Sequence, residues 1–214
     1  NQLPTTLPSN WKVEKQDDGL FKVEVDGELS VLLPDTISSK VCSAGQLPTG
    51  FDPANLYQSR NHPRGLQLTI FAASDAVSSL GINWEQVKNR VPPDQISVYA
   101  SSAMGQLDSN GSGGLLQAAL QGRRTTSKNL PLGLAEMTAD FVNAYVLGNV
   151  GTTGANIGAC ATFLYNLRQG INDIKSGKYK VAIVGASEAP LTPEVIEGYR
   201  KIGALAEDEA LAKI

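Results

Sequence analysis

Residues 164–185, LYNLRQGINDIKSGKYKVAIVG, place an amphipathic segment directly before an apolar one. The apolar residues of the first part recur at helical spacing and are Leu164, Leu167, Ile171 and Ile174. That spacing predicts a helix, and Gly177 is a typical residue for its end. Residues 179–185 are mostly apolar, which is typical of a strand covered on both faces. We therefore expect a surface helix followed by a buried strand.

Helical and extended patterns also alternate over the preceding hundred or so residues. The spacing of apolar residues predicts a helix over 66–80, closed by Gly81, and another over 130–147, bounded by Gly148. Between them, residues 96–100 are rich in β-prone side chains. Strands that alternate with helices predict an α/β layered fold, with a mixed, partly parallel sheet covered by helices.

The first 60 residues follow a different pattern. Residues 11–15 and 20–25 alternate apolar and polar side chains, and Asp17-Asp18-Gly19 between them is suited to a turn. A small antiparallel hairpin is expected there, followed by a mostly irregular stretch over 34–65 that contains four prolines. We therefore divide the chain into a β-rich insertion at 1–60 and an α/β domain at 61–214.

Composition excludes several classes of protein. Hydrophobic residues make up 42% of the chain and charged residues 18%, which indicates a globular domain. The formal charge of -3, with no basic block, argues against nucleic-acid binding. Two distant cysteines do not form a disulfide framework, and a single histidine argues against a histidine-based metal site. With no long apolar run and no signal-peptide pattern at residues 1–10, we expect a soluble, cytoplasmic protein.

Cys160 is the candidate nucleophile. The segment Asn156-Ile157-Gly158-Ala159-Cys160-Ala161-Thr162 lies between a short extended stretch and the amphipathic helix, which places the cysteine in a turn at the helix N-terminus. The free N–H groups there stabilise a thiolate, and they can also bind an oxyanion formed at a substrate carbonyl. Small neighbours leave room for that substrate. The alternative from the residues alone is a small buried cysteine with no chemical role.

The segment 158–162 also resembles the active-site signature of the β-ketoacyl synthases, the condensing enzymes of fatty-acid and polyketide synthesis. Residues 172–188 are similar to that family's helix, strand and "G-G-x-E" run, and 202–205 to its "M-G-A-L" element. Residues 98–105 lie where the family has a strand and a glycine-rich turn. The resemblance covers about residues 66–214 and implies the N-terminal half of a thiolase-like fold, truncated at both ends. Residues 1–60 match poorly, which suggests a divergent bacterial subgroup.

The resemblance also implies roles for particular residues. Cys160 would take an acyl group from a thioester of acyl carrier protein or coenzyme A and condense it with malonyl-acyl-carrier-protein. The residues that would bind substrate are Met104, Gly105, Gln106, Phe141 and Phe163. Those that would dock the acidic carrier are Arg123, Arg124 and Lys128. Family members are homodimers that pair strands near the nucleophile, here 151–158, and no cofactor or metal is implied. The pocket residues are equally compatible with ordinary core or loop, and the basic residues with an ordinary solvated charge run.

The sequence departs from the family pattern at several points. Nothing matches the family's H-G-T-x-T or G-F-G-G motifs, so its two catalytic histidines and its lysine are absent, and this chain alone should be inactive in condensation. Phe163 replaces a small serine, which leaves the acyl-chain length open.

A thiolase-type acyltransferase and a non-catalytic scaffold of the same fold are the main alternatives. A nucleotide-binding domain and a serine hydrolase are disfavoured, because the glycine spacing at 148–154 and the surroundings of Ser187 do not fit.

Overall fold

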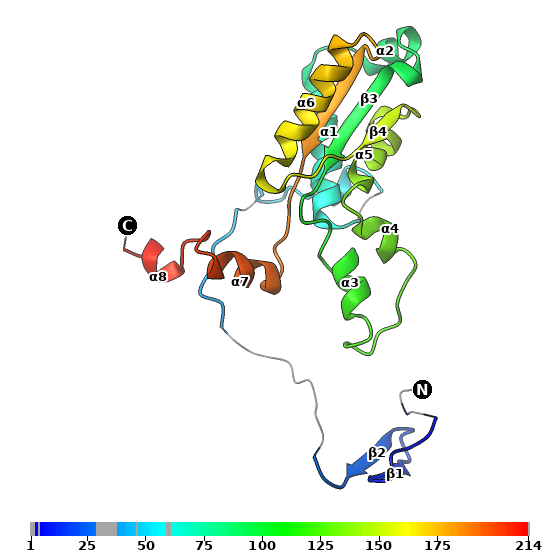
Figure 1. Ribbon diagram of the computed structural model, residues 1–214, viewed down its shortest axis with the longest axis vertical. Coiled ribbons are helices and arrows are strands. Elements are labelled where there is room, and N and C mark those ends of the chain that lie inside the picture. The colour runs from blue at the N-terminus through cyan, green and yellow to red at the C-terminus, as the bar shows by residue number, and fades with distance from the viewer. Residues whose placement is uncertain (1–2, 4, 29–37, 46, 59–60, 214) are drawn as a thin grey trace. The chain divides into compact units, whose positions relative to one another are not determined.

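The computed structural model describes residues 3, 5–28, 38–45, 47–58 and 61–213, and Figure 1 shows its helices and strands. The chain divides into two units, Asn1–Ser38 and Ser39–Ile214. Each unit is described by itself below. The domain boundary at residue 60 stays a prediction.

The first unit contains the expected hairpin. Strand β1 (Trp11–Lys15) pairs antiparallel with β2 (Phe21–Val25), and the register sets Trp11 opposite Val25. At the turn, the Leu20 carbonyl accepts a hydrogen bond from the Gln16 N–H at 2.8 Å. Most side chains of the two strands are exposed, so backbone hydrogen bonds account for most of the order here.

The second unit is built on a three-stranded parallel sheet in the order β4-β3-β5. The central strand β3 (Ile96–Ser101) is buried along its whole length. It pairs with β4 (Thr152–Gly154) on one side and with β5 (Val181–Ala186) on the other. The strands predicted over 96–100 and 179–185 are therefore confirmed, and the predicted extended stretch before Cys160 contains β4.

Helices cover both faces of this sheet (Figure 1). Val98 and Ala100 of β3 pack against α5 (Met137–Val142), which in turn packs on α1 (Arg64–Ser79). On the opposite face, α6 (Thr162–Lys175) lies along β3 and β5. The helix predicted over 66–80 is confirmed as α1, and Gly81 follows it with a positive φ of 67°.

The remaining elements are short. They are the helices α2 (Trp84–Arg90), α3 (Ser112–Gln117), α4 (Asn129–Gly133), α7 (Pro193–Lys201) and α8 (Asp208–Leu211), the 3₁₀ turns η1 (Pro53–Asn55), η2 (Pro93–Gln95) and η4 (Ala159–Ala161), and the π-helical turn η3 (Asn143–Leu147). The irregular stretch predicted over 34–65 is confirmed for its described residues up to Pro63, apart from η1. Residues 34–37, 46 and 59–60 lie outside the described part of the chain.

The single helix predicted over 130–147 is wrong. The segment forms α4, a break, α5 and η3, and it ends at Gly148 in the left-handed conformation with φ 60°. In and next to the break, the carbonyls of Gly133 and Ala135 accept hydrogen bonds from the N–H groups of Gln106 and Ser102. These long-range bonds engage carbonyls that a continuous helix would use internally.

Helix α6 is amphipathic as predicted, but the residues that it buries are polar or small, and its apolar side chains are partly or largely exposed. The buried residues are Thr162, Asn166, Gly170 and Asp173, whereas Leu164 is 60% exposed and Ile171 and Ile174 are 44% and 45% exposed. Strand β5 is an edge strand, and its residues are half-buried or exposed. The expectation that both faces of this strand are covered is therefore not met in the described part of the chain.

Within the described ranges, no helix by itself has the length and apolar character needed to cross a bilayer. Helices α1 and α2 pass that test only when they are taken together, and they are bent by 83° where they meet.

Candidate active site

Cys160 lies in the tight turn η4, directly before α6. Ala159, the residue before it, has a φ of 49°, the left-handed region that a residue with a Cβ rarely enters. Thr162 holds the turn: its Oγ1 accepts a hydrogen bond from the Gly158 N–H at 3.1 Å and donates one to the Ala159 carbonyl at 2.7 Å. Strained backbone of this kind persists where the surrounding structure enforces it, and it is concentrated at functional sites.

The thiol of Cys160 is free and exposed. Among the residues that the structure describes, none accepts a hydrogen bond from the Cys160 N–H. That group is therefore available at the N-terminal end of α6 to donate a hydrogen bond to an oxyanion formed beside the sulfur.

A cavity of about 430 Å³ opens beside Cys160. Its walls come from the Cys160 turn, the residues after β3, the residues after β5, and α7. The lining residues are Ala103, Met104, Ile157, Ala159, Cys160, Thr162, Phe163, Ala186, Glu188, Pro190 and Tyr199. The lining is mostly apolar, and the volume is in the range of small-molecule sites, so the cavity suits an apolar chain attached to a reactive carbonyl.

Asn166 connects the Cys160 segment to the ends of the two longest strands. Its Nδ2 donates hydrogen bonds to Ser101 Oγ at 2.8 Å and to the Gly185 carbonyl at 2.9 Å. Its Oδ1 accepts hydrogen bonds from the Asn156 N–H at 3.0 Å and from Asn156 Nδ2 at 3.2 Å. The side chain is fully buried, so losing any of these bonds would leave polar groups unsatisfied. Asn166 therefore fixes the chain segment that leads to the cysteine.

Of the substrate-binding residues that the sequence predicts, the structure brings Met104 and Phe163 to the Cys160 cavity. Gly105, Gln106 and Phe141 are not among its described lining residues. Gln106 is buried with its side chain against Gly65, and Phe141 packs on His62 at 5.0 Å and stacks on Tyr145 at 5.7 Å between ring centroids. Their assignment to the substrate site stays a prediction.

The predicted carrier-docking residues share one exposed segment. Arg123, Arg124 and Lys128 lie between α3 and α4, and none of them forms an ion pair with another described residue. Their charge is therefore free to attract an acidic partner.

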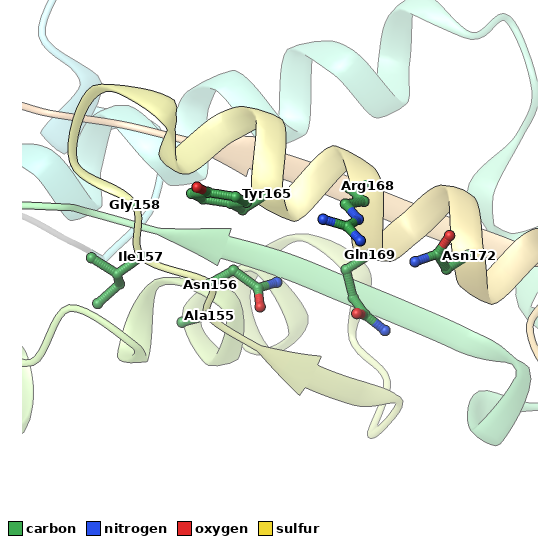
Figure 2. Close-up of a pocket in the computed structure, with 8 residues that line it drawn as sticks. All are labelled: Ala155, Asn156, Ile157, Gly158, Tyr165, Arg168, Gln169 and Asn172. Atoms are coloured by element: carbon green, nitrogen blue, oxygen red, sulfur yellow. The ribbon is translucent and has the colours of Figure 1, made fainter.

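The sequence did not predict a second hollow, which lies beside the Cys160 turn (Figure 2). It has a volume of about 610 Å³ and runs between residues 155–158 and α6. Tyr165, Arg168, Gln169 and Asn172 project into it from the helix. Gly158 is required here, because a Cβ at this position would lie 1.9 Å from the Tyr165 ring. The groove borders the segment that continues from β4, the edge strand on this side of the sheet.

The described residues offer no cluster of three His, Cys, Asp or Glu side chains that could hold a metal ion. His62, the single histidine of the sequence, lies in the aromatic cluster with Phe141 and Tyr145 and is not among the described residues that line the cysteine's cavity.

A parallel sheet with helices on both faces, and a cysteine exposed where one of those helices begins, agree with the thiolase-like class of fold that the sequence resemblance implies. The chain belongs to the β-ketoacyl synthase family: the family profile "Beta-ketoacyl synthase, N-terminal domain" matches residues 34–213. The predicted fold class and the predicted family are therefore confirmed.

Individual relatives agree with this result. The chain is 53% identical to the beta-ketoacyl-[acyl-carrier-protein] synthase FabY of Pseudomonas aeruginosa, over 100% of this chain and 34% of that protein. The crystal structure of the noncanonical ketosynthase FabY from the same species superposes with a TM-score of 0.89, over 97% of this chain and 33% of that one. A β-ketoacyl synthase from Burkholderia phymatum, 18% identical, superposes with a TM-score of 0.60 over 74% of this chain and 38% of its own, and this likeness shows the fold alone. The chain spans about a third of the length of the first two relatives.

Proposed function

We propose that this chain carries the nucleophile of a β-ketoacyl-acyl-carrier-protein synthase of fatty-acid biosynthesis, with Cys160 as the catalytic residue. The main support is geometric: Cys160 is a free thiol in a strained turn at the start of α6, and it lines an apolar cavity of about 430 Å³. The likeness to FabY, whose name describes this reaction, supports the same assignment. A thiolase-type acyltransferase remains the alternative enzyme.

The first step is acyl transfer to the thiol. Cys160 Sγ attacks the carbonyl carbon of an acyl thioester, and the Cys160 N–H donates a hydrogen bond to the oxyanion that forms. When this intermediate collapses, the bond from carbon to the carrier sulfur breaks. The proton lost by Cys160 ends on the released carrier thiol, and the acyl group remains on the enzyme with its chain in the apolar cavity.

The second step is condensation. Malonyl-acyl-carrier-protein loses carbon dioxide, and the resulting carbanion attacks the acyl carbonyl carbon. A carbon–carbon bond forms, the bond to Cys160 Sγ breaks, and the product is a 3-oxoacyl thioester two carbons longer. Two histidines assist this step in the family, and this chain contains only His62, held in an aromatic cluster. We therefore expect this chain alone to be acylated but not to condense.

The partners follow from the same assignment. An acidic acyl carrier protein would dock on the unpaired cations Arg123, Arg124 and Lys128. A second copy of the protein would pair along the edge that runs from β4 through residues 151–158, because this strand edge has no neighbour among the described residues. Residues 61–214 would form the N-terminal half of the condensing domain and 1–60 an insertion into it. No cofactor is needed, and the expected location is the cytoplasm.

Acyl trapping tests the proposal. The chain is incubated with octanoyl-coenzyme A, and the adduct is located by peptide mass spectrometry. We expect one octanoyl group on Cys160, retained in Cys42→Ala and lost in Cys160→Ala. Cys42→Ala is the matched control, because Cys42 is also a free, exposed thiol. An unmodified Cys160 in the folded chain would favour the non-catalytic scaffold and overturn the proposal.

A further inference from the structure

Glu188 contributes to the wall of the Cys160 cavity and also binds the chain on the opposite wall. It follows the end of β5, and its Oε2 accepts a hydrogen bond from Ser102 Oγ at 3.0 Å. Its Oε1 accepts a hydrogen bond from the Ala103 N–H. One carboxylate therefore connects the residues after β5 to the residues after β3.

The residues that Glu188 holds lead directly into the cavity lining. Ala103 and Met104 form the wall contributed by the β3 side, and Ser102, just before them, is buried. Hydrogen bonds from backbone N–H and hydroxyl groups to a carboxylate are stronger than those between neutral groups. The other described contacts of this turn are longer: the Ser102 N–H donates to the Ala135 carbonyl at 3.4 Å, and the Gly105 carbonyl, 3.2 Å from Ser102 Oγ, competes with Glu188 for the one hydroxyl proton.

We propose that Glu188 is a positioning residue that fixes the Met104 wall of the cavity and thereby sets the length of the chain that Cys160 accepts. The proposal rests on the function proposed above and adds a determinant of substrate specificity to it. Each carboxylate oxygen of Glu188 accepts a hydrogen bond from the turn, so both oxygens tie this group to the wall.

The test uses thiol reagents that need no catalysis. Methyl and octyl methanethiosulfonate are reacted separately with the full chain in a Cys42→Ala background, and the rate at Cys160 is followed by mass spectrometry. The measured quantity is the ratio of the octyl rate to the methyl rate. We expect Glu188→Ala to change this ratio by about fivefold or more, because both hydrogen bonds are lost. Glu188→Gln, which keeps one acceptor, should give an intermediate ratio.

The matched control is Glu194→Gln, which removes the same charge from α7. Glu194 accepts a hydrogen bond from Gln117 and is not among the described residues that line the cavity. Its ratio should equal that of the unaltered chain. A ratio unchanged in both Glu188 variants would overturn the proposal. A loss of both rates together, with altered circular dichroism, would also overturn it, because Glu188 would then serve only folding.

A parallel arm separates this proposal from the proposed function. The same variants are offered acetyl- and octanoyl-coenzyme A. If the unaltered chain takes no acyl group while the methanethiosulfonate ratio still depends on Glu188, the proposed function fails and the positioning role stands. If acylation occurs with the same preference in all variants, the positioning role fails and the proposed function stands.

Discussion

Cys42 and Cys160 are both exposed thiols, but their immediate surroundings differ in charge. The Asp208 carboxylate accepts hydrogen bonds from the Cys42 N–H at 3.1 Å, and its hydrogen bond with the thiol and its negative charge both raise the pKa of the Cys42 thiol. A raised pKa lowers the thiolate fraction at neutral pH, and the thiolate is the reactive form. We therefore expect iodoacetamide near pH 7 to label Cys160 well before Cys42, as measured by peptide mass spectrometry over time.

The control for this prediction is Asp208→Asn, which removes the charge beside Cys42 and leaves the Cys160 turn unaltered. Labelling of Cys42 should become faster in this variant, and labelling of Cys160 should not change. The effect of Asp208→Asn on the labelling of Cys42 should vanish as the pH rises above the pKa of the Cys42 thiol. Equal labelling rates of the two cysteines in the unaltered chain would contradict the prediction.

His62 makes the stability of the protein sensitive to acid. Its ring is buried edge-on against the rings of Phe141 and Tyr145, and its Nδ1 has no partner among the described residues. This burial lowers the pKa of His62 from the usual 6.5. The unfolded chain therefore binds a proton at a pH where the folded chain does not. Stability should be greatest above pH 6.5 and should fall as the pH drops through that value.

Urea denaturation at pH 7.5 and at pH 5.5 measures this loss. We expect a lower midpoint at pH 5.5 in the unaltered chain and a smaller difference in His62→Phe, whose ring fills the same aromatic site without a titrating group. An equal difference in both proteins would show that other groups cause the acid sensitivity.

At the scale of single elements, α6 and β5 approach closely because Gly170 has no side chain. A Cβ at this position would lie 2.7 Å from Val184 Cγ1 and 3.3 Å from Ala182 Cβ. Alanine normally stabilises a helix interior by about 1 kcal/mol relative to glycine. Here the steric clash should dominate, and we expect Gly170→Ala to lower the free energy of unfolding by about 1–3 kcal/mol, as measured by urea denaturation.

Two further variants isolate the cause of that effect. Gly198→Ala in α7 is the matched control, because a Cβ there meets nothing within 4 Å, and it should stabilise by up to about 1 kcal/mol. In a Val184→Ala background, Gly170→Ala should cost less than in the unaltered chain, since the clashing methyl group is gone. If the cost of Gly170→Ala were the same in both backgrounds, the contact with Val184 would not be its origin.

Local sequence correctly predicts the helices and strands whose pattern of apolar and polar residues is complete within the segment itself. The hairpin, β3, β5, α1 and α6 follow from periodicity and from turn residues. The break after α4 does not, because it is made by carbonyls at Gly133 and Ala135 that bond to the chain after β3. Local sequence also does not predict the orientation of α6. Periodicity shows that the helix has an apolar and a polar face, but not which of the two meets the sheet.

Local sequence likewise predicts only part of the candidate site. Its placement and the family resemblance both predict Cys160, the resemblance alone predicts Met104 and Phe163, and the structure brings the three to one cavity. The sequence did not predict Asn166 and Tyr199, because their contacts are with residues distant in the sequence and form only in the folded chain. One local signal for Asn166 was present: the polar residues Thr162, Asn166 and Asp173 lie at helical spacing on one face of α6, opposite its apolar residues.

At the scale of the molecule, charge distribution gives a test of the proposed carrier site. Arg124 and Lys128 are exposed and without described ion-pair partners. We expect Arg124→Glu combined with Lys128→Glu to weaken binding of acyl carrier protein at low salt by about tenfold or more, since each contact between opposite charges is replaced by repulsion. Isothermal titration calorimetry at low ionic strength measures the dissociation constant.

The control makes the same change of charge on the hairpin, with Lys12→Glu and Lys15→Glu. Both lysines are exposed and belong to the other unit of the chain. This variant should bind the carrier nearly as well as the unaltered chain. If both double variants weakened binding equally, net charge and not a local docking site would be responsible.

The α6–β5 side of the second unit presents a continuous apolar surface. Leu164, Ile171 and Ile174 are exposed, and Leu167, Ile171, Ile174, Ala182 and Val184 help to line a groove of about 320 Å³. No described residue outside α6 and β5 lines that groove. Contiguous apolar surface of this kind binds apolar molecules or other apolar surfaces.

We therefore expect the chain to bind the dye anilinonaphthalene sulfonate through this surface, with Ile171→Gln combined with Ile174→Gln removing most of the fluorescence gain. Because both side chains are nearly half exposed, at 44% and 45%, the two changes together should alter the free energy of unfolding by no more than about 1 kcal/mol. Leu80→Gln combined with Ile82→Gln is the control, since these residues are similarly exposed but lie after α1 and outside the groove. Unchanged dye binding in the α6 variant would show that the apolar side of α6 is not the binding surface, and a large loss of stability would show that these side chains are buried in solution.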